Sequence, residues 1–238
     1  MAVVTLTIDG NLISARAGET VLQAARDAKI HIPTLCYLEG LSAAAACRLC
    51  LIEIQGQNRL QASCCTVAKE GMVVLTQSEK IRQYRKMILE LLFAEGNHIC
   101  AVCVANGHCE LQNLAEEFGM DHVRYEYLHP DRKVDVSHHQ FAFDHDRCVY
   151  CARCVRTCDE IEGAHVWDVS GRGIHVEIIA EMDEAWGDAV SCTSCGKCVQ
   201  ACPTGALFQK GSTVGEMVKR PGKLTELMVE RKEKRWNG

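Results

Sequence analysis

The sequence is poor in aromatic residues, long apolar runs and nucleotide-binding loops. Phe, Trp and Tyr make up only 5% of the 238 residues, which is little for a large conventional core. No stretch approaches the ~18 apolar residues of a membrane helix, so no direct membrane insertion is expected. There is no G-x-G-x-x-G motif or P-loop to hold a nucleotide. A net charge of −5 argues against a nucleic-acid-binding surface.

Cysteine, in contrast, is abundant, with 16 residues in the chain. In a secreted protein so many cysteines would suggest disulfides. The segment Met1–Gly10, however, has neither the basic flank nor the apolar core of a signal peptide. We therefore expect a cytoplasmic location in which the thiolates are committed to metal, and metal binding would supply much of the folding free energy.

Two cysteine runs, residues 148–158 and 192–202, share the spacing C-x2-C-x2-C-x3-C. This is the bacterial ferredoxin spacing, in which three cysteines of a run bind one cubane cluster and the fourth reaches across to the other cluster. The spacing therefore predicts two [4Fe–4S] clusters in one folded unit. The first would be held by Cys148, Cys151, Cys154 and Cys202, and the second by Cys158, Cys192, Cys195 and Cys198.

A pair of structural zinc sites is the alternative interpretation, because zinc sites also use C-x2-C pairs. Zinc sites usually join two such pairs across a loop. A triplet at two-residue spacing followed by a fourth cysteine, occurring twice, favours iron–sulfur clusters over zinc.

The first 78 residues combine a hairpin, a helix and a cysteine loop. The alternating pattern of 3–15 predicts a hairpin that turns at Asp9-Gly10. Thr20 is a suitable N-cap for the following helix, which Pro33 should end. These elements are typical of a β-grasp ferredoxin of the [2Fe–2S] kind.

The cysteine loop has the spacing C-x10-C-x2-C-x13-C, in place of the four residues that plant-type ferredoxins have between their first two ligands. The small residues 42–46 should let backbone N–H groups approach the sulfides. The longer insertion resembles the N-terminal domain shared by the large iron–sulfur subunit of complex I, iron-only hydrogenases and NAD-linked hydrogenases. This resemblance selects Cys64 as a ligand and leaves Cys65 as a small buried hydrophobe. The predicted [2Fe–2S] ligands are Cys36, Cys47, Cys50 and Cys64.

Residues 79–118 change to a helical pattern and then carry three cysteines spaced C-x2-C-x5-C, one ligand short of a cubane. The corresponding segment of complex I and iron-only hydrogenases uses a histidine as the fourth ligand. That resemblance indicates His98, with His108 as the rival, although His98 lies two residues before the first cysteine rather than four. A neutral imidazole should raise the potential of this cluster. The predicted [4Fe–4S] ligands are His98, Cys100, Cys103 and Cys109.

The remaining segments are expected to connect or extend these units. Residues 119–140 are predicted to form a connector. Residues 141–210 are predicted to form the two-cluster domain, with a hairpin over 166–179 between its cysteine runs. Residues 211–238 read as a charged helical tail. The predicted fold class is therefore α+β, in a modular iron–sulfur protein.

Individual side chains in these segments carry further expectations. In the tail, Leu224, Leu227 and Met228 should contact the body or a partner. Three histidines are expected to be solvated or hydrogen-bonded rather than metal-binding, because nothing nearby in the sequence completes a ligand set. They are His138, His139 and His145.

Nearly the whole chain resembles the HoxU family, the iron–sulfur subunits in the diaphorase part of bidirectional, NAD(P)-linked [NiFe] hydrogenases, most closely in their cyanobacterial form. Four motifs are shared in looser form with complex I, and a fifth, 159–168, narrows the resemblance. The four are Pro33-Thr-Leu-Cys36, Cys47-Arg-Leu-Cys50, Phe93-Ala-Glu-Gly-Asn-His98 and Cys109-Glu-Leu-Gln112.

The resemblance implies an electron-relay subunit of an oxidoreductase complex, with one [2Fe–2S] and three [4Fe–4S] clusters and no catalytic residue of its own. It implies as partners a flavin- and NAD(P)H-binding diaphorase subunit, a small [2Fe–2S] diaphorase subunit, the small and large [NiFe] hydrogenase subunits, and a soluble ferredoxin. Since only a tail follows Phe208, the catalytic ends are expected in other subunits. The [2Fe–2S] domain would be a branch or a docking point.

Three other functions remain open. The chain could serve the same relay in an NADH dehydrogenase or an NAD-dependent formate dehydrogenase, which co-purification of nickel would distinguish. It could be a zinc-bound interaction protein, which metal analysis would reveal. It could be a free ferredoxin-like carrier, which would be recovered as a stable monomer with its clusters.

Overall fold

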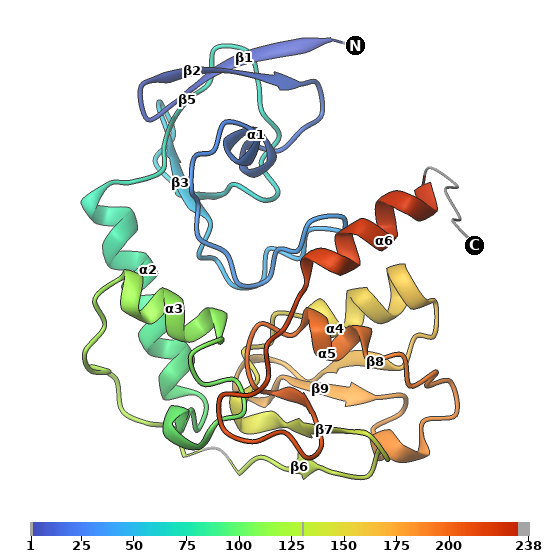
Figure 1. Cartoon of the computed structure of the whole chain (residues 1–238). Helices are drawn as coiled ribbons and strands as arrows, with labels where there is room; N and C mark the ends of the chain where they lie inside the picture. Colours follow the sequence, from blue (N-terminus) through green and yellow to red (C-terminus); the bar gives the residue numbers. More distant parts are fainter. Residues whose placement is uncertain (1, 130, 233–238) are drawn as a thin grey trace.

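The computed structural model describes residues 2–129 and 131–232, with the backbone alone for residues 231 and 232. Figure 1 shows an N-terminal unit of strands and one helix, two longer helices beside it, and a C-terminal unit of short helices and small sheets. The fold is α+β and modular, as predicted.

The N-terminal unit is a five-stranded sheet, in the order β2-β1-β5-β3-β4, with one helix against it. The first two strands are antiparallel, from Val3 opposite Arg16 to Ile8 opposite Asn11, so the predicted hairpin is confirmed. Asp9 and Gly10 at its turn both have positive φ, as such tight turns require. The elements are β1 (Val3–Ile8), β2 (Asn11–Arg16), α1 (Val21–Asp27), β3 (Leu51–Ile54), β4 (Gln61–Ala62) and β5 (Val73–Leu75).

Helix α1 begins as predicted and ends earlier than predicted. Thr20 accepts a hydrogen bond from the Gln23 N–H, while the Gln23 side chain accepts one from the Thr20 N–H, which completes a capping box. The helix ends at Asp27, and Lys29 follows in the left-handed region with φ of 60°. The turn at Lys29, and not Pro33, therefore ends this helix.

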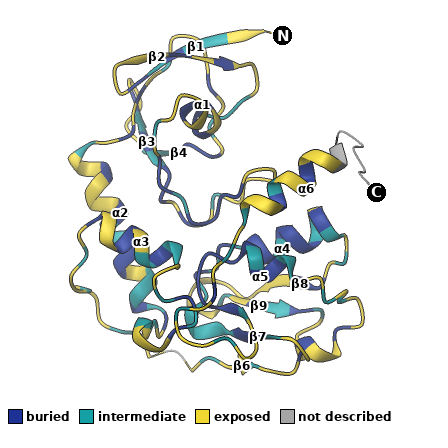
Figure 2. Ribbon diagram, viewed as in Figure 1, coloured by how far each residue is buried: buried dark blue, intermediate teal, exposed yellow. Residues whose placement is uncertain are grey.

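Helices α2 (Glu79–Ala94) and α3 (Glu110–Glu117) pack together beside the sheet. Ile81 is fully buried on α2, as predicted. Tyr84 and Leu91, which the helical pattern also placed in the core, are 42% and 39% exposed. Polar side chains share the buried face instead, and Figure 2 shows the outer face of α2 open to solvent.

The C-terminal unit combines a three-stranded sheet, order β10-β7-β6, with the hairpin β8-β9 and several short helices. The predicted hairpin over 166–179 is present, but its pairing runs from Trp167 opposite Ala180 to Ser170 opposite Glu177, so it ends one residue later than predicted. The elements are β6 (Val134–Asp135), β7 (Phe141–Asp144), α4 (Arg153–Arg156), a π-helix (Thr157–Glu162), β8 (Trp167–Ser170), β9 (Glu177–Ala180), α5 (Lys197–Ala201) and β10 (Leu207–Gln209). Short 3-10 turns occur at Cys100–Val102, His145–Arg147, Gly173–His175 and Trp186–Asp188.

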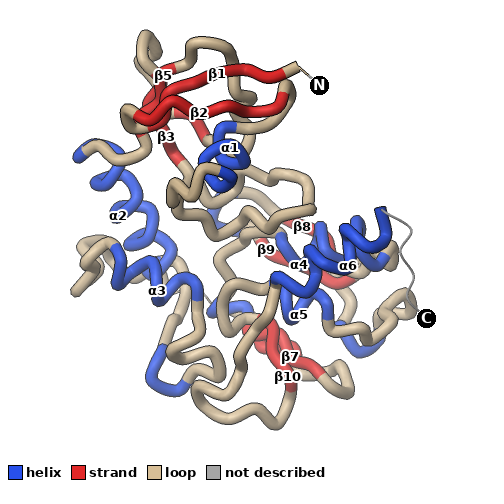
Figure 3. The backbone as a smooth tube through the Cα atoms, turned by 45° about the horizontal axis from the view of Figure 1, so that its top comes forward, coloured by secondary structure: helices blue, strands red, loops and turns tan. Residues whose placement is uncertain are grey.

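The last helix, α6 (Gly222–Lys232), lies over α4 and α5 and meets a loop that descends from the N-terminal unit (Figure 1, Figure 3). Leu224 and Met228 are buried there, as predicted, whereas Leu227 is 42% exposed. Residues 233–238 of the predicted tail, and Pro130 of the predicted connector, lie outside the described residues. No helix within the described part of the chain is both long and apolar enough to cross a membrane.

Candidate functional site

The predicted histidine and cysteine ligands of the middle segment line one cavity. Cys100 begins a 3-10 turn in the segment after α2, and Cys103 follows the end of that turn. Cys109 occupies the N-cap position of α3. The far wall comes from the C-terminal unit, at Thr204 and Gly205. The ligands that converge here are His98, Cys100, Cys103 and Cys109.

The imidazole of His98 is neutral and, within the described part of the chain, has an unpaired ring nitrogen, as a metal ligand requires. Burial lowers the pKa of its imidazole to about 4, so the ring is neutral at physiological pH. Its Nε2 atom is buried and has no hydrogen-bond partner among the described residues. A hydrogen bond to the Leu92 backbone engages the ring, in the way that ligating histidines are usually oriented. The rival, His108, is exposed and does not line the cavity.

A second cavity brings together cysteines from both ferredoxin-like runs. The fourth cysteine of the first run, Cys158, joins three cysteines of the second run, which is the crossover that the spacing predicted. The indole of Trp186 also lines this cavity, and its N–H is buried without a partner in the described structure, so it is free to donate to a sulfur. The four cysteines are Cys158, Cys192, Cys195 and Cys198.

The reciprocal crossover places Cys202 beside the first run. Burial raises the pKa of Cys148 well above its usual value, and the neighbouring Cys151 and Cys202 raise it further. Burial does the same to Cys154, with the same neighbours contributing. A buried thiolate needs a compensating cation, and the irons of a cluster would supply it.

The two runs turn in the same way around their second cysteine. Tyr150 and Ala152 flank Cys151 with φ of 48° and 52°, and Ser194 and Gly196 flank Cys195 with φ of 56° and 67°. Three of these four are not glycine, and each such residue costs roughly 1–3 kcal/mol in this conformation. The same left-handed turn is therefore repeated on both sides of the second cysteine of each run.

The four predicted [2Fe–2S] ligands lie in two hydrogen-bonded pairs. A hydrogen bond from Cys47 lowers the pKa of Cys36 to about 5, and one from Cys64 lowers the pKa of Cys50 to about 6. Cys65 is exposed, with its sulfur 3.7 Å from that of Cys64, so the expectation of a buried Cys65 was wrong.

Backbone donors around this site are arranged partly as expected. The Ala46 N–H bonds to the thiol of Cys36. The Ser42 N–H instead donates to the Glu160 carboxylate of the C-terminal unit, at 2.8 Å. The insertion between the first two cysteines therefore serves both the sulfurs and the contact between units.

The donor sets fit clusters by their chemistry: three sets of four thiols and one of three thiols with a neutral imidazole. Among the residues that the structure describes, no three His, Cys, Asp or Glu side chains converge closely enough to hold a single metal ion.

Sequence reasoning missed the polar residues that join the units. Arg153 and Arg156 of α4 are 3% and 8% exposed. Arg153 donates to both carboxylate oxygens of Glu110, at 2.7 and 2.8 Å. Gly205 permits a close approach, since a Cβ there would lie 2.4 Å from the sulfur of Cys103. Both arginines lie inside a cysteine run, but nothing in the local sequence indicates their distant partners.

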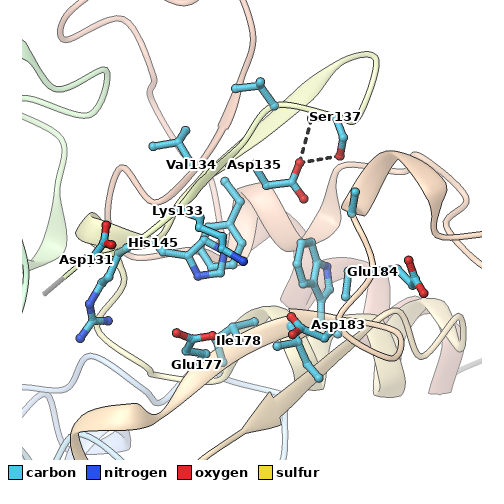
Figure 4. Close-up of a pocket in the computed structure, with 17 residues that line it drawn as sticks. Asp131, Lys133, Val134, Asp135, Ser137, His145, Glu177, Ile178, Asp183 and Glu184 are labelled. Atoms are coloured by element: carbon cyan, nitrogen blue, oxygen red, sulfur yellow. Dashed lines mark hydrogen bonds between the residues drawn. The ribbon is translucent and has the colours of Figure 1, made fainter.

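A separate groove of about 540 Å³ lies between β6 and the β8-β9 hairpin (Figure 4). Asp135 and Ser137 on one side are joined by hydrogen bonds, and Glu177 of β9 and Asp183 of the turn after it line the opposite side. None of its described lining residues is a cysteine, so none of the predicted clusters would lie there. The nearby His138 is buried and lies 3.1 Å from the Ser194 hydroxyl, in line with the expected hydrogen-bonded histidine.

Three family profiles match the chain in succession. Residues 1–79 match a 2Fe-2S iron-sulfur cluster binding domain. Residues 85–124 match the NADH-ubiquinone oxidoreductase-G iron-sulfur binding region. Residues 140–208 match the ferredoxin-like domain of NADH-quinone oxidoreductase subunit 3. The chain thus carries regions of both the 2Fe-2S and the 4Fe-4S type.

Individual relatives match over most of the chain. The gamma subunit of NAD-reducing hydrogenase HoxS from Cupriavidus necator is 32% identical, over 87% of each chain. Subunit HndD of an NADP-reducing hydrogenase from Solidesulfovibrio fructosivorans is 39% identical over 88% of this chain, which spans only 36% of HndD. A crystal structure of an NAD+-reducing [NiFe]-hydrogenase in the H2-reduced state contains a chain that is 37% identical, with a TM-score of 0.84 and 89% coverage of both chains.

Proposed function

Because this chain belongs to the family of iron–sulfur subunits that includes the gamma subunit of NAD-reducing hydrogenase HoxS, we propose that it relays electrons between a diaphorase and a [NiFe] hydrogenase module. When bound, the clusters supply one-electron transfer. The chain's own residues hold them, exclude water and fix the distances between them.

The observation that carries this proposal is the grouping of the cysteines. The sequence places the two ferredoxin-like runs 33 residues apart, yet Cys158 lies with the second run and Cys202 with the first. This exchange of one cysteine between runs is what two adjacent cubanes require. We therefore propose the four predicted ligand sets as the sites of one [2Fe–2S] and three [4Fe–4S] clusters.

We propose the same modular division that the sequence predicted: a [2Fe–2S] domain at 1–78, a His/Cys3 domain at 79–118, a connector at 119–140, a two-cubane domain at 141–210 and a tail at 211–238. The short helices and small sheets of the two-cubane domain support it, because such a unit needs bound metal to supplement its core.

Hydrogenase and diaphorase subunits are the proposed partners. The flavin subunit would exchange hydride with NAD(P)H, and the small [2Fe–2S] subunit would form part of the same diaphorase. The nickel-containing subunits would exchange electrons with hydrogen. A soluble ferredoxin would be a further partner at the [2Fe–2S] domain, and the proposed location is the cytoplasm.

Purification of the intact complex through a tag on this chain tests both parts. We expect about 14 irons in this subunit with matching acid-labile sulfide, together with flavin and nickel in its partners. Zinc without iron would contradict the clusters. Iron and flavin without nickel would favour the second candidate, a subunit of an NADH dehydrogenase, which the two matches to NADH oxidoreductase regions also suggest.

A further inference from the structure

The one-turn helix α4 carries two buried arginines on one face. Arg153 and Arg156 are three residues apart and so lie on the same side of the helix. A buried charge is costly unless hydrogen bonds satisfy it, so both must be held by specific contacts. Both lie in the first cysteine run: Arg153 directly precedes Cys154, and Arg156 lies two residues from both Cys154 and Cys158.

The guanidinium of Arg156 reaches proposed ligands of two different clusters. Its Nη2 donates to the carbonyl oxygen of Cys36, at 2.6 Å, and to that of Cys151, at 3.1 Å. Its Nη1 donates to the carbonyl of Ser42 and its Nε to that of Ala152. Cys36 is a proposed [2Fe–2S] ligand and Cys151 a proposed cubane ligand, so one planar group clamps both ligand loops.

The two arginines differ in how their charge is balanced. Arg153 forms a bidentate ion pair with Glu110 and also donates to the carbonyl of Tyr37. Arg156 donates only to carbonyl oxygens within the described part of the chain. Its positive charge is therefore left to act on its surroundings, where the interior screens it less than water does.

We propose that Arg156 is a positioning residue that holds the Cys36 loop against the Cys151 loop and supplies a shared positive charge to the two clusters bound there. This inference rests on the proposed function, because it needs those ligand assignments. It makes the [2Fe–2S] domain part of a coupled pair with the adjacent cubane, and not a loosely attached branch.

Arg156 would have two separable effects: its positive charge acts on both clusters, and its hydrogen bonds hold the Cys36 and Cys151 loops together. Reduction makes a cluster more negative, so a nearby cation raises the potentials of both clusters. The clamp depends on the rigid fork of arginine, which lysine cannot reproduce because its ammonium is a single point on a flexible stem. Arg156→Gln removes the charge, whereas Arg156→Lys keeps the charge and removes the fork.

The test is a redox titration of the intact complex, followed by electron paramagnetic resonance. In Arg156→Gln we expect the potentials of the [2Fe–2S] cluster and of one [4Fe–4S] cluster to fall together, while the other two stay at their wild-type values. In Arg156→Lys we expect potentials near wild type and severalfold faster hydrogen exchange in residues 36–46.

Arg85 provides a matched control. It is also buried, at 4% exposure, and donates to the carbonyls of Leu49 and Leu51 beside the [2Fe–2S] site, at 2.8 and 2.9 Å. Those contacts stay within one cluster loop, so Arg85→Gln should leave every cubane potential unchanged.

Three results would overturn the proposal: Arg156→Gln shifting neither potential or only one, either Arg156 variant losing iron from all four sites alike, or Arg156→Lys leaving exchange of 36–46 unchanged. A wild-type complex that lacks the four cluster signals would instead contradict the proposed function.

Discussion

His98 is the residue on which the proposed middle cluster should depend. Its buried, neutral Nε2 lies in a cavity with three cysteines, so His98→Ala should leave that cluster one ligand short. We expect one [4Fe–4S] signal in electron paramagnetic resonance to change or disappear, with a loss of up to about 4 of the ~14 irons.

His108→Ala is the matched control for this prediction. His108 lies in the same cysteine loop but is exposed, so its removal should leave iron content and spectrum unchanged. The ligand assignment would be wrong if His108→Ala altered the signal and His98→Ala did not.

Gly205 of the C-terminal unit lies against the sulfur of Cys103, a proposed ligand of the middle cluster. A Cβ at this position would lie 2.4 Å from the sulfur of Cys103, too close for a carbon and a sulfur that are not bonded to each other. We expect Gly205→Ala to displace this thiolate and to reduce the same [4Fe–4S] signal that His98→Ala affects, measured by iron content and resonance spectra. Gly222→Ala has open space around it and should leave both unchanged.

Cysteine spacing predicted the proposed ligands but not the arginine contacts that join the units. Cysteine spacing depends on the shape of a cluster, so it indicated which sulfurs would meet. The roles of Arg153 and Arg156 depend on carbonyls of Tyr37 and Cys36, which lie 116 and 120 residues away in the sequence. Such partners are brought together only by the packing of the units, so the sequence gives no local sign of them.

At the scale of elements, the insertion between Cys36 and Cys47 acts as a bridge. Its Leu38 and Leu41 share a buried cluster with side chains of the π-helix, α5 and α6. A shorter plant-type loop would lack the residues that make this contact. Sequence comparison found the extra length, but only the structure shows what the loop touches.

Helix α6 should hold this bridge in place. Leu224, on the buried face of α6, is 3% exposed. Leu224→Ala should therefore leave a cavity and cost about 2–5 kcal/mol of local stability. We expect faster hydrogen exchange in residues 38–46, measured by mass spectrometry on the intact complex. Leu227→Ala, at a 42% exposed position on the same helix, is the control and should change exchange little.

Equal effects of the two leucine substitutions would show that α6 does not secure the loop. Local hydropathy predicted contact for both residues, and the structure separates them because only one face of the helix meets the loop.

At the scale of the whole molecule, the units differ in what holds them together. The N-terminal sheet and α1 enclose an apolar core that includes Leu6, Ile8, Leu22 and Ile52, all at 1% exposure or less. The core of the C-terminal unit combines apolar side chains, among them Trp167 and Trp186, with four proposed ligand cysteines, Cys154, Cys158, Cys198 and Cys202. Its helices α4 and α5 have only four and five residues.

This difference predicts that iron removal will unfold the molecule unevenly. Without clusters, the C-terminal unit would bury several thiols around cavities and lose the metal–ligand energy that compensates for its small core. The N-terminal sheet would lose one cluster and keep its apolar core. We expect anaerobic chelation to abolish hydrogen-exchange protection in β7–β10 while β1 and β2 remain protected.

Tryptophan fluorescence gives an independent measurement of the same event. Trp167 and Trp186 are 4% and 1% exposed in the C-terminal unit, and Trp236→Phe would remove the third tryptophan of the sequence. In that background, chelation should shift emission to the red as the two indoles reach water, before β1 and β2 begin to exchange. Simultaneous loss of protection in both units would show that the clusters stabilise one cooperative fold, and the uneven dependence on metal inferred from the two cores would be wrong.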